Sequence, residues 1–342
     1  MIDSAFSSHK VLKFPDAGIE FLENNKPKNP FFLPFYQKLV LFIKNLIVSK
    51  EDIEVRQILI DEIVQKIQSQ YQTDSNDIII LPCGSSMNGT FLSNSDIDLA
   101  LLSYPMPSSP DMMDELKVSL QDLLLPQGNY QPIPTAGVPV LKFDIKPGIS
   151  IDLTFDDIHG PLSVSPINDI FKQMPFICPA QLFFKFILRE KDLEKPFTGG
   201  ISSYTLLMML VGYVQQTGPP HDIVDLILGF CKFFGKDFNY SLTGIDIRNS
   251  GILFSRIEKN MLSLESPSTM CIIDPLNPKN ILGHNSFNMP KIQMIFYQIY
   301  QAIEHGEGET LLKDFDSEVM NLKTFQNQIK QYANEILGKY KK

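Results

Sequence analysis

The sequence has no tryptophan, only four cysteines in 342 residues, and fewer basic than acidic side chains. The 30 Lys and Arg against 39 Asp and Glu give a formal net charge of −9, and the pI is about 5.1. A protein that holds nucleic acid through bulk electrostatics is basic. If this chain meets RNA or DNA, it therefore needs a local basic groove or a partner protein.

The four cysteines, Cys83, Cys178, Cys231 and Cys271, are scattered and form no C-x-x-C pair. Zinc sites in short domains use closely paired cysteines, and disulfide frameworks belong to oxidising compartments. The pattern argues against both and favours a reducing compartment.

Long hydrophobic runs are missing as well. Leu206–Val214 is among the longest, and the helix-like stretch Phe31–Val48 is interrupted by Lys38 and Lys44. A membrane-spanning helix needs roughly 18–20 apolar residues, and residues 1–12 lack the pattern of a signal peptide. We therefore expect a soluble, intracellular protein with no membrane partner.

The length and the 44% hydrophobic residues are typical of a globular chain with two domains. Residues 1–29 are polar and are expected to be a flexible lead-in. A helix follows at 30–48, then a unit of strands and helices at 49–156, then a mostly helical unit at 157–342. The predicted fold class is α+β.

The hydrophobic periodicity predicts the individual elements. Helices are expected over 31–48, 51–71, 110–125, 167–193, 201–216, 221–235, 289–305 and 312–340. Strands are expected over 77–83, 95–102, 138–145 and 149–155. In the last helix, Phe315, Val319, Leu322, Ile329 and Ile336 form an apolar stripe that we expect to lie in the core.

Two aspartates with a short spacing give the first chemical signal. Asp96 and Asp98 are two residues apart in a predicted strand, so their carboxylates lie on one face. Such a pair suits Mg²⁺, which prefers a few carboxylates together with substrate phosphates. The Gly84-Ser85 turn upstream offers backbone N–H groups and a hydroxyl for phosphate. Taken alone, the two aspartates could equally be solvated residues of an edge strand.

Asp152 changes this balance. It stands alone between Ile151 and Leu153 in an apolar strand, where an unpaired carboxylate is costly. Three aspartates on two neighbouring strands are what a two-metal centre for nucleotidyl transfer requires.

Polar residues in the predicted helical unit add candidates for phosphate and base contacts. Lys185 and Arg189 are one turn apart on an apolar helix and could face a triphosphate, or they could lie at a helix edge with their charges in water. Ser203 could cap the next helix or bind phosphate. Tyr204 could stack on a base or pack in the core.

Several motifs resemble one family. Gly84-Ser85, Asp96, Asp98 and Asp152 resemble the catalytic signature of the polymerase-beta nucleotidyltransferase superfamily. The segments Phe197–Tyr204, Phe234–Tyr240 and Asp274–Asn280 resemble the Trf-type divergent poly(A) polymerases, cousins of the terminal uridylyltransferases. The similarity extends from about residue 50 to about residue 305.

The resemblance implies a polymerase-beta-like catalytic domain and a helical, poly(A)-polymerase-associated central domain, with a nucleotide cleft between them and the helix at 30–48 packed on the central domain. It implies two Mg²⁺ (or Mn²⁺) ions held by the three aspartates, with Asp152 as the candidate base. The substrates would be ATP and an RNA 3′ end, a separate RNA-binding protein would be a partner, and a nuclear location is slightly favoured. The nucleotide contacts implied are Gly84, Ser85, Lys185, Arg189, Ser203, Tyr204, Asp274, Asn277 and Asn280, the last three in a recognition loop at 274–288.

Position 280 bears on the choice of base. Adenylyl relatives carry Asn there, as this chain does, whereas uridylyl relatives carry His; Asn280 could also simply hold a turn. His159 and His284 depart from the family pattern, and we expect no metal role for either. The alternatives are a terminal uridylyltransferase and an inactive nucleotide-binding scaffold, and the intact aspartates argue against the scaffold.

Overall fold

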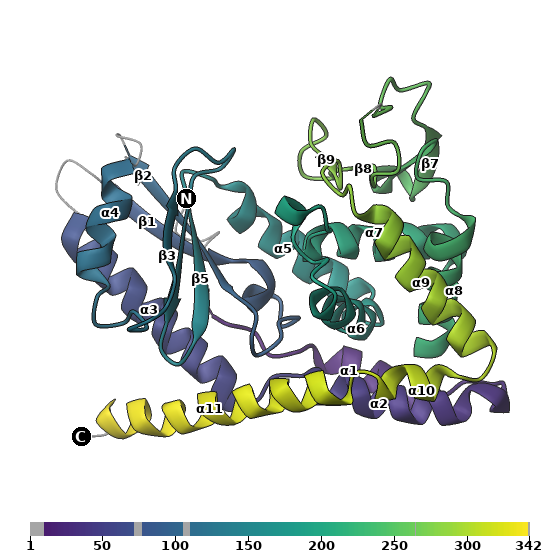
Figure 1. Ribbon diagram of the computed structural model, residues 1–342, viewed down its shortest axis with the longest axis horizontal. Helices are drawn as coiled ribbons and strands as arrows, with labels where there is room; N and C mark the ends of the chain where they lie inside the picture. The colour runs from purple at the N-terminus through teal and green to yellow at the C-terminus, as the bar shows by residue number, and fades with distance from the viewer. Residues whose placement is uncertain (1–9, 72–76, 105–109, 264, 341–342) are drawn as a thin grey trace. The chain divides into compact units, whose positions relative to one another are not determined.

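The computed structural model describes residues 10–71, 77–104, 110–263 and 265–340 (Figure 1). The chain divides into two compact units. Unit 1 comprises Met1–Phe14, Ile47–Ile170 and Asn321–Lys342, and unit 2 comprises Pro15–Leu46 and Phe171–Met320. The structural division therefore differs from the expected bounds, because the end of the C-terminal helix belongs with the first unit.

Unit 1 is built on a five-stranded mixed sheet with the order β1-β2-β5-β4-β3. Its strands are β1 (Asp77–Cys83), β2 (Ile97–Tyr104), β3 (Tyr130–Ile133), β4 (Val140–Ile145) and β5 (Ile149–Phe155). The central pair β2 and β5 is parallel, and the other pairs are antiparallel. The four strands expected from the sequence are all present, and β3 was not expected.

The alternation of side chains along β5 separates the core face of the sheet from the opposite face. Ile149, Ile151, Leu153 and Phe155 are buried, while the residues between them, including Asp152, are half-buried. Helices α3 (Lys50–Tyr71) and α4 (Pro110–Ser119) lie beside the sheet (Figure 1), and their apolar side chains belong to the same core. The period of two in a strand thus places Asp152 away from the hydrophobic cluster.

The C-terminal helix α11 (Asp316–Tyr340) completes the core of unit 1. Ile329 and Ala333 are 0% and 1% exposed, and Lys330 Nζ lies 3.5 Å from Glu51 Oε1 of α3. The expected apolar stripe is confirmed as core, since all five of its residues are buried. Helix α5 (His159–Gln173) begins in unit 1 as well.

Unit 2 is mostly helical. Its helices are α1 (Asp16–Asn24), α2 (Leu33–Leu46), α6 (Ile177–Glu190), α7 (Ser203–Thr217), α8 (Ile223–Lys232), α9 (Met289–Glu304) and α10 (Gly308–Lys313). Phe230 lies at the centre of an aromatic cluster, with its ring 4.7 Å from that of Phe184 and 5.3 Å from that of Phe296. A small sheet accompanies the helices, with the order β7-β6-β8-β9. Its strands are β6 (Thr243–Asp246), β7 (Ile252–Ser255), β8 (Ile272–Ile273) and β9 (Ile281–Leu282).

Two features of the helical part differ from the sequence prediction. The run expected over 167–193 is two helices, α5 and α6, separated around Pro175. Proline lacks an N–H group and disfavours a helical conformation in the preceding residue, so the break falls there. The small sheet was also not expected, because its strands have only two to four residues each.

One helical stretch, Pro30–Tyr71, is long and apolar enough to cross a membrane by length and composition alone, with 39% of its most apolar window buried. Residues 47–49 interrupt this stretch between α2 and α3. Core helices of soluble proteins pass the same test, and α2 has 14 residues, fewer than the roughly 17 that a span requires.

Candidate active site

The parallel pairing of β2 and β5 brings two of the three predicted aspartates together. Asp98 and Asp152 are register partners on these adjacent strands. Both side chains are half-buried, and their strand neighbours Ile97, Leu99 and Ile151 are fully buried. Asp96 stands one residue before β2 begins and is half-buried too. The expectation that the aspartates belong to neighbouring strands is therefore met by Asp98 and Asp152, with Asp96 at the entry to β2.

Gly84 makes room for the Asp98 carboxylate. Its φ is +66°, in the left-handed region that favours glycine. A Cβ atom at this position would lie 1.9 Å from Asp98 Oδ2. Gly84 opens the short helical turn η2 (Gly84–Met87), which also carries the half-buried Ser85. The Gly-Ser turn thus lies directly against one of the predicted metal ligands.

Lys142 on β4 is a site residue that the sequence reasoning missed. It is the register partner of Asp152, and its ammonium group forms an ion pair with the Asp152 carboxylate. The signal was available in the alternation of β4, where Leu141 and Phe143 are buried and Lys142 points to the face of Asp152. The carboxylate is paired with a cation, as an Asp in an apolar strand requires.

Cys83 is the register partner of Asp98 on β1, and the pKa of its thiol responds to the negative charges nearby. Burial raises the pKa of its thiol, and the negative charges of Asp98 and Asp157 raise it further. The thiol therefore stays neutral beside the carboxylates.

The aspartates have the chemistry that a divalent cation needs. Carboxylate oxygens are hard ligands suited to Mg²⁺, Asp98 and Asp152 are side by side, and Asp152 already holds a cationic group. Within the described ranges, no three His, Cys, Asp or Glu side chains converge closely enough to form a metal-holding group by themselves. The donor set fits Mg²⁺, with the remaining ligands left to substrate phosphates and water.

In unit 2, the candidate phosphate contacts on α6 differ in burial. Lys185 is only 6% exposed, whereas Arg189, one turn further on, is half-buried. The pKa of Glu194 is raised by burial, and the nearby Arg189 charge opposes that shift. Arg189 therefore lies close enough to the acidic side chain of Glu194 to interact with its charge. Lys185 is the stronger candidate of the two for a phosphate contact, because a lysine is rarely buried unless its charge is paired.

At the beginning of α7, Ser202 and Ser203 have different roles. The N-cap is Ser202, whose Oγ accepts from Thr205 N at 3.1 Å. The Ser203 carbonyl accepts from Gln181 Nε2 at 3.3 Å, and its hydroxyl takes no part in the cap. The sequence alternatives for Ser203 were capping and phosphate binding, and the cap is formed by Ser202.

Asp274 organises the residues predicted to contact the base. Its Oδ1 accepts from the Tyr204 hydroxyl at 3.1 Å, and its Oδ2 accepts from Asn280 Nδ2 at 2.8 Å. Burial raises the pKa of Tyr204, and the Asp274 charge adds to the shift. Because a carboxylate can only accept, the Asn280 amide must turn its NH₂ group toward Asp274. The amide oxygen is then the group that Asn280 can offer elsewhere.

Asn280 also holds the recognition loop together. Its backbone oxygen accepts from Asp274 N at 3.1 Å, and its backbone N–H donates to Asn277 O at 2.8 Å. Asn277 Oδ1 in turn accepts from Lys279 N at 3.3 Å. Turn formation and base contact are therefore compatible roles for Asn280.

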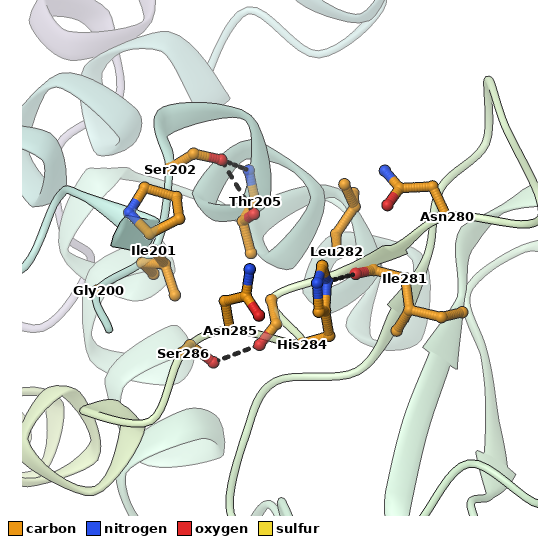
Figure 2. Close-up of a pocket in the computed structure, with 12 residues that line it drawn as sticks. Gly200, Ile201, Ser202, Thr205, Asn280, Ile281, Leu282, His284, Asn285 and Ser286 are labelled. Atoms are coloured by element: carbon orange, nitrogen blue, oxygen red, sulfur yellow. Dashed lines mark hydrogen bonds between the residues drawn. The ribbon is translucent and has the colours of Figure 1, made fainter. Parts of the chain in front are cut away.

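A pocket of about 160 Å³ adjoins this loop. Figure 2 shows Ser202 and Thr205, from the start of α7, on one side of it and His284, Asn285 and Ser286 on the other. His284 is exposed, and its Nδ1 lies 2.8 Å from Ile281 O. His159 is exposed at the start of α5, where its N–H donates to Asp157 Oδ1 at 3.0 Å.

Comparisons with known proteins agree with this architecture. Residues 35–164 match the model of the mitochondrial-like poly(A) RNA polymerase central palm domain, and residues 222–280 match that of the Cid1 family poly(A) polymerase. The fold and the matched models are those of the polymerase-beta-type nucleotidyltransferases. Within that superfamily, the chain is similar in its matched segments to the Trf-type proteins, the divergent poly(A) polymerases and their terminal nucleotidyltransferase relatives.

Two curated relatives represent this group. The chain is 26% identical over 329 residues to poly(A) RNA polymerase cid14 of Schizosaccharomyces pombe, covering 90% of this chain and 47% of the relative. It is 27% identical over 223 residues to an inactive poly(A) RNA polymerase protein, Trf4-2, of Drosophila melanogaster, covering 60% and 53%. The chain thus spans about half the length of each of these two relatives.

Two solved structures share the fold. The polymerase core of TRAMP, an RNA surveillance complex, superposes with a TM-score of 0.66 at 19% identity, covering 88% of this chain and 96% of that one. A His-to-Asn variant of Cid1 poly(U) polymerase bound to MgATP superposes with a TM-score of 0.65 at 16% identity, covering 80% and 95%.

Proposed function

We propose that the protein is a template-independent RNA 3′-end adenylyltransferase, which adds AMP from ATP to RNA. The observation that carries the proposal is the pairing of Asp98 with Asp152 on parallel strands, with Gly84 against the Asp98 carboxylate. A structural role alone does not require carboxylates to be concentrated on the functional face of the sheet.

In the proposed reaction, the RNA 3′-hydroxyl attacks the α-phosphate of ATP in line. The bond to the bridging oxygen breaks, and pyrophosphate leaves. Asp152 accepts the proton of the hydroxyl. Asp96, Asp98 and Asp152 would hold two Mg²⁺ (or Mn²⁺) ions, which when bound supply a lower pKa for the hydroxyl and charge neutralisation for the triphosphate.

Two sets of residues are proposed to contact phosphate. Gly84 and Ser85 offer the backbone N–H groups and hydroxyl of η2. Lys185 and Arg189 would bring positive charge, and Ser203 a hydroxyl at the beginning of α7. Contacts of this kind with phosphate oxygens would hold a triphosphate in a fixed orientation for in-line attack.

The preference for adenine is proposed to depend on Asn280. Tyr204 would stack on the base, and Asn277 would support the loop. With its NH₂ group bound to Asp274, Asn280 offers its amide oxygen as an acceptor. Adenine presents a donor at N6, whereas uracil presents an acceptor at O4, so the oxygen matches adenine at this edge.

The first alternative is a terminal uridylyltransferase, because the solved Cid1 structure that shares the fold is a poly(U) polymerase. The second is an inactive scaffold, because one curated relative is described as inactive. The pairing of Asp98 and Asp152 favours an enzyme, and Asn280 favours ATP over UTP. An RNA-binding protein partner and an intracellular, preferably nuclear, location belong to the same proposal.

The decisive experiment supplies the purified protein with Mg²⁺, a labelled RNA primer and each nucleoside triphosphate separately. We expect extension with ATP, and loss of at least about 10²-fold in rate for Asp98→Ala. Asp122→Ala is the matched control, since Asp122 is an aspartate of unit 1 that is 63% exposed and paired with Lys66. Extension with UTP alone would establish the uridylyltransferase. ATP binding by the folded wild type without any extension would establish the scaffold.

A further inference from the structure

Helix α3 carries a buried charged pair that none of these roles uses. Asp52 and Arg56 are both 0% exposed, and Arg56 Nε donates to Asp52 Oδ1 at 3.3 Å. Burial raises the pKa of Asp52, and the Arg56 charge opposes the shift. A guanidinium in the interior is costly unless its N–H groups are bonded and its charge is compensated. An apolar residue would fill this position of α3 at lower cost, so packing alone does not account for Arg56.

Three further contacts of Arg56 go to one loop. Its Nη2 donates to the Ser93 carbonyl at 2.7 Å and to the Ser95 carbonyl at 2.8 Å. Its guanidinium carbon lies 4.7 Å from the centre of the Phe91 ring. Phe91, Ser93 and Ser95 are all buried, so these carbonyls depend on protein donors rather than on water. Arg56 therefore fixes three points of the loop that leads into β2.

Asp96 is the last residue of this loop before β2 begins. The Ser95 carbonyl belongs to the same planar peptide unit as the Asp96 N–H, so the bond from Arg56 orients the backbone at Asp96 directly. Among the described residues, no hydrogen bond or ion pair holds the Asp96 carboxylate itself. Asp98 and Asp152 are held by the pairing of β2 with β5. Asp96 precedes β2, and its place depends on the loop.

We propose that Arg56 is a positioning residue for Asp96: the buried guanidinium holds the Ser93 and Ser95 carbonyls and thereby sets the Asp96 carboxylate for cation binding. The inference deepens the proposed function and rests on it. The sequence contained a signal, since Asp52 and Arg56 are four residues apart beside Val55 and Leu59 on the apolar face of the predicted helix.

The test measures Mn²⁺ binding to the full chain by electron paramagnetic resonance, in the presence of an ATP analogue with a methylene group between its α- and β-phosphates. Arg56→Lys keeps the charge but loses the rigid planar guanidinium. We expect the apparent dissociation constant for Mn²⁺ to rise at least fivefold, while the KM for ATP changes less than twofold. The kcat should fall and recover in part at high Mg²⁺.

The matched control is Arg256→Lys. Arg256 is a second buried arginine, 3% exposed, that donates to the carbonyls of Tyr240, Met261 and Thr269 in unit 2. Its replacement should lower the melting temperature and leave Mn²⁺ binding unchanged. A folded Arg56→Lys protein with wild-type Mn²⁺ binding would overturn the inference and leave a purely structural role.

If Arg56→Lys does not fold, Mn²⁺ binding is measured on Asp52→Asn instead. This substitution removes the charge that pairs with Arg56 but keeps the guanidinium itself. Weaker Mn²⁺ binding supports the inference, and unchanged binding overturns it. The proposed function fails separately: a wild-type protein that binds Mn²⁺ but does not extend RNA contradicts the function and not the positioning role. A wild-type protein that binds no Mn²⁺ contradicts both.

Discussion

At the scale of single residues, the backbone or a neighbouring side chain constrains several of the candidate site residues. Gly84 combines a left-handed φ with a Cβ direction that points at Asp98. Asp152 forms an ion pair with Lys142. Asp274 is bound to Tyr204 and Asn280 at once. Each of these contacts constrains a side chain that the proposed reaction needs.

Gly84→Ala tests the contact with Asp98. The new methyl group would overlap Asp98 Oδ2, and alanine is strained at a φ of +66°. We expect primer extension to fall at least about 10²-fold, since moving a catalytic group by roughly 1 Å is enough for such a loss. Gly137→Ala is the control, because a Cβ there would have no neighbour within 4 Å. Wild-type rates for Gly84→Ala would show that the Asp98 carboxylate can move without consequence.

Asn280→His tests the choice of base. The wild-type protein should prefer ATP over UTP at least tenfold in kcat/KM, which needs only about 1.4 kcal/mol. The variant should shift the ratio toward UTP, because the imidazole is bulkier and no longer presents the amide oxygen. Steady-state kinetics with both nucleotides measure the ratio. Equal or faster use of UTP by the wild type would contradict the adenylyl assignment.

At the scale of secondary structure elements, α11 shows how an element remote in sequence supports the catalytic sheet. Ile329 is fully buried in the cluster that also contains Val55 and Ile151. Phe325 lies 3.5 Å from the Cβ position of Gly148, in the turn between β4 and β5. The helix therefore packs against the elements that carry Arg56 and Asp152.

Ile329→Ala should lower the free energy of unfolding by about 2–5 kcal/mol, the range for removing a large buried aliphatic side chain. Urea denaturation followed by circular dichroism measures the change. Met320→Ala on the same helix is the control, because Met320 is 62% exposed and its loss should cost less than about 0.5 kcal/mol. Equal stabilities of the two variants would exclude a structural role for α11 in the core.

At the scale of the whole molecule, the net charge of −9 opposes binding to RNA. Affinity for single-stranded nucleic acid falls with salt in proportion to the number of phosphates contacted. The isolated protein should therefore make short tails and be strongly inhibited by salt. We expect extension under subsaturating RNA to fall roughly tenfold between 50 and 200 mM salt, which corresponds to about two phosphate contacts.

Gel analysis of tail lengths at increasing salt measures this effect. Addition of a basic RNA-binding partner should lengthen the tails and reduce the salt sensitivity. Long tails made by the isolated protein at physiological salt would mean that its own surface holds RNA well enough, and that no partner is needed for processivity.

Local sequence patterns determined much of this protein. The period of two in residues 149–155 places Asp152 opposite the buried Ile151 and Leu153, and the period of 3.6 in α3 buries Val55 and Ile63. Both follow from backbone geometry over a few residues, so they can be predicted without the fold. The aspartate spacing and the Gly-Ser turn belong to the same class of local information.

Only the tertiary structure decided which of these local features meet. Asp98 and Asp152 are neighbours because β2 pairs with β5, and Lys142 joins them through β4. The bond from Arg56 to Ser95 and the inclusion of Asn321–Lys342 in unit 1 have the same origin. Hydrophobic periodicity predicts which face of an element is buried but not which element covers it, because the hydrophobic effect is non-directional. The partners are chosen by strand pairing and core packing across distant parts of the chain. Those contacts bring Asp98 and Asp152 together in one candidate site, with Asp96 at the entry to β2.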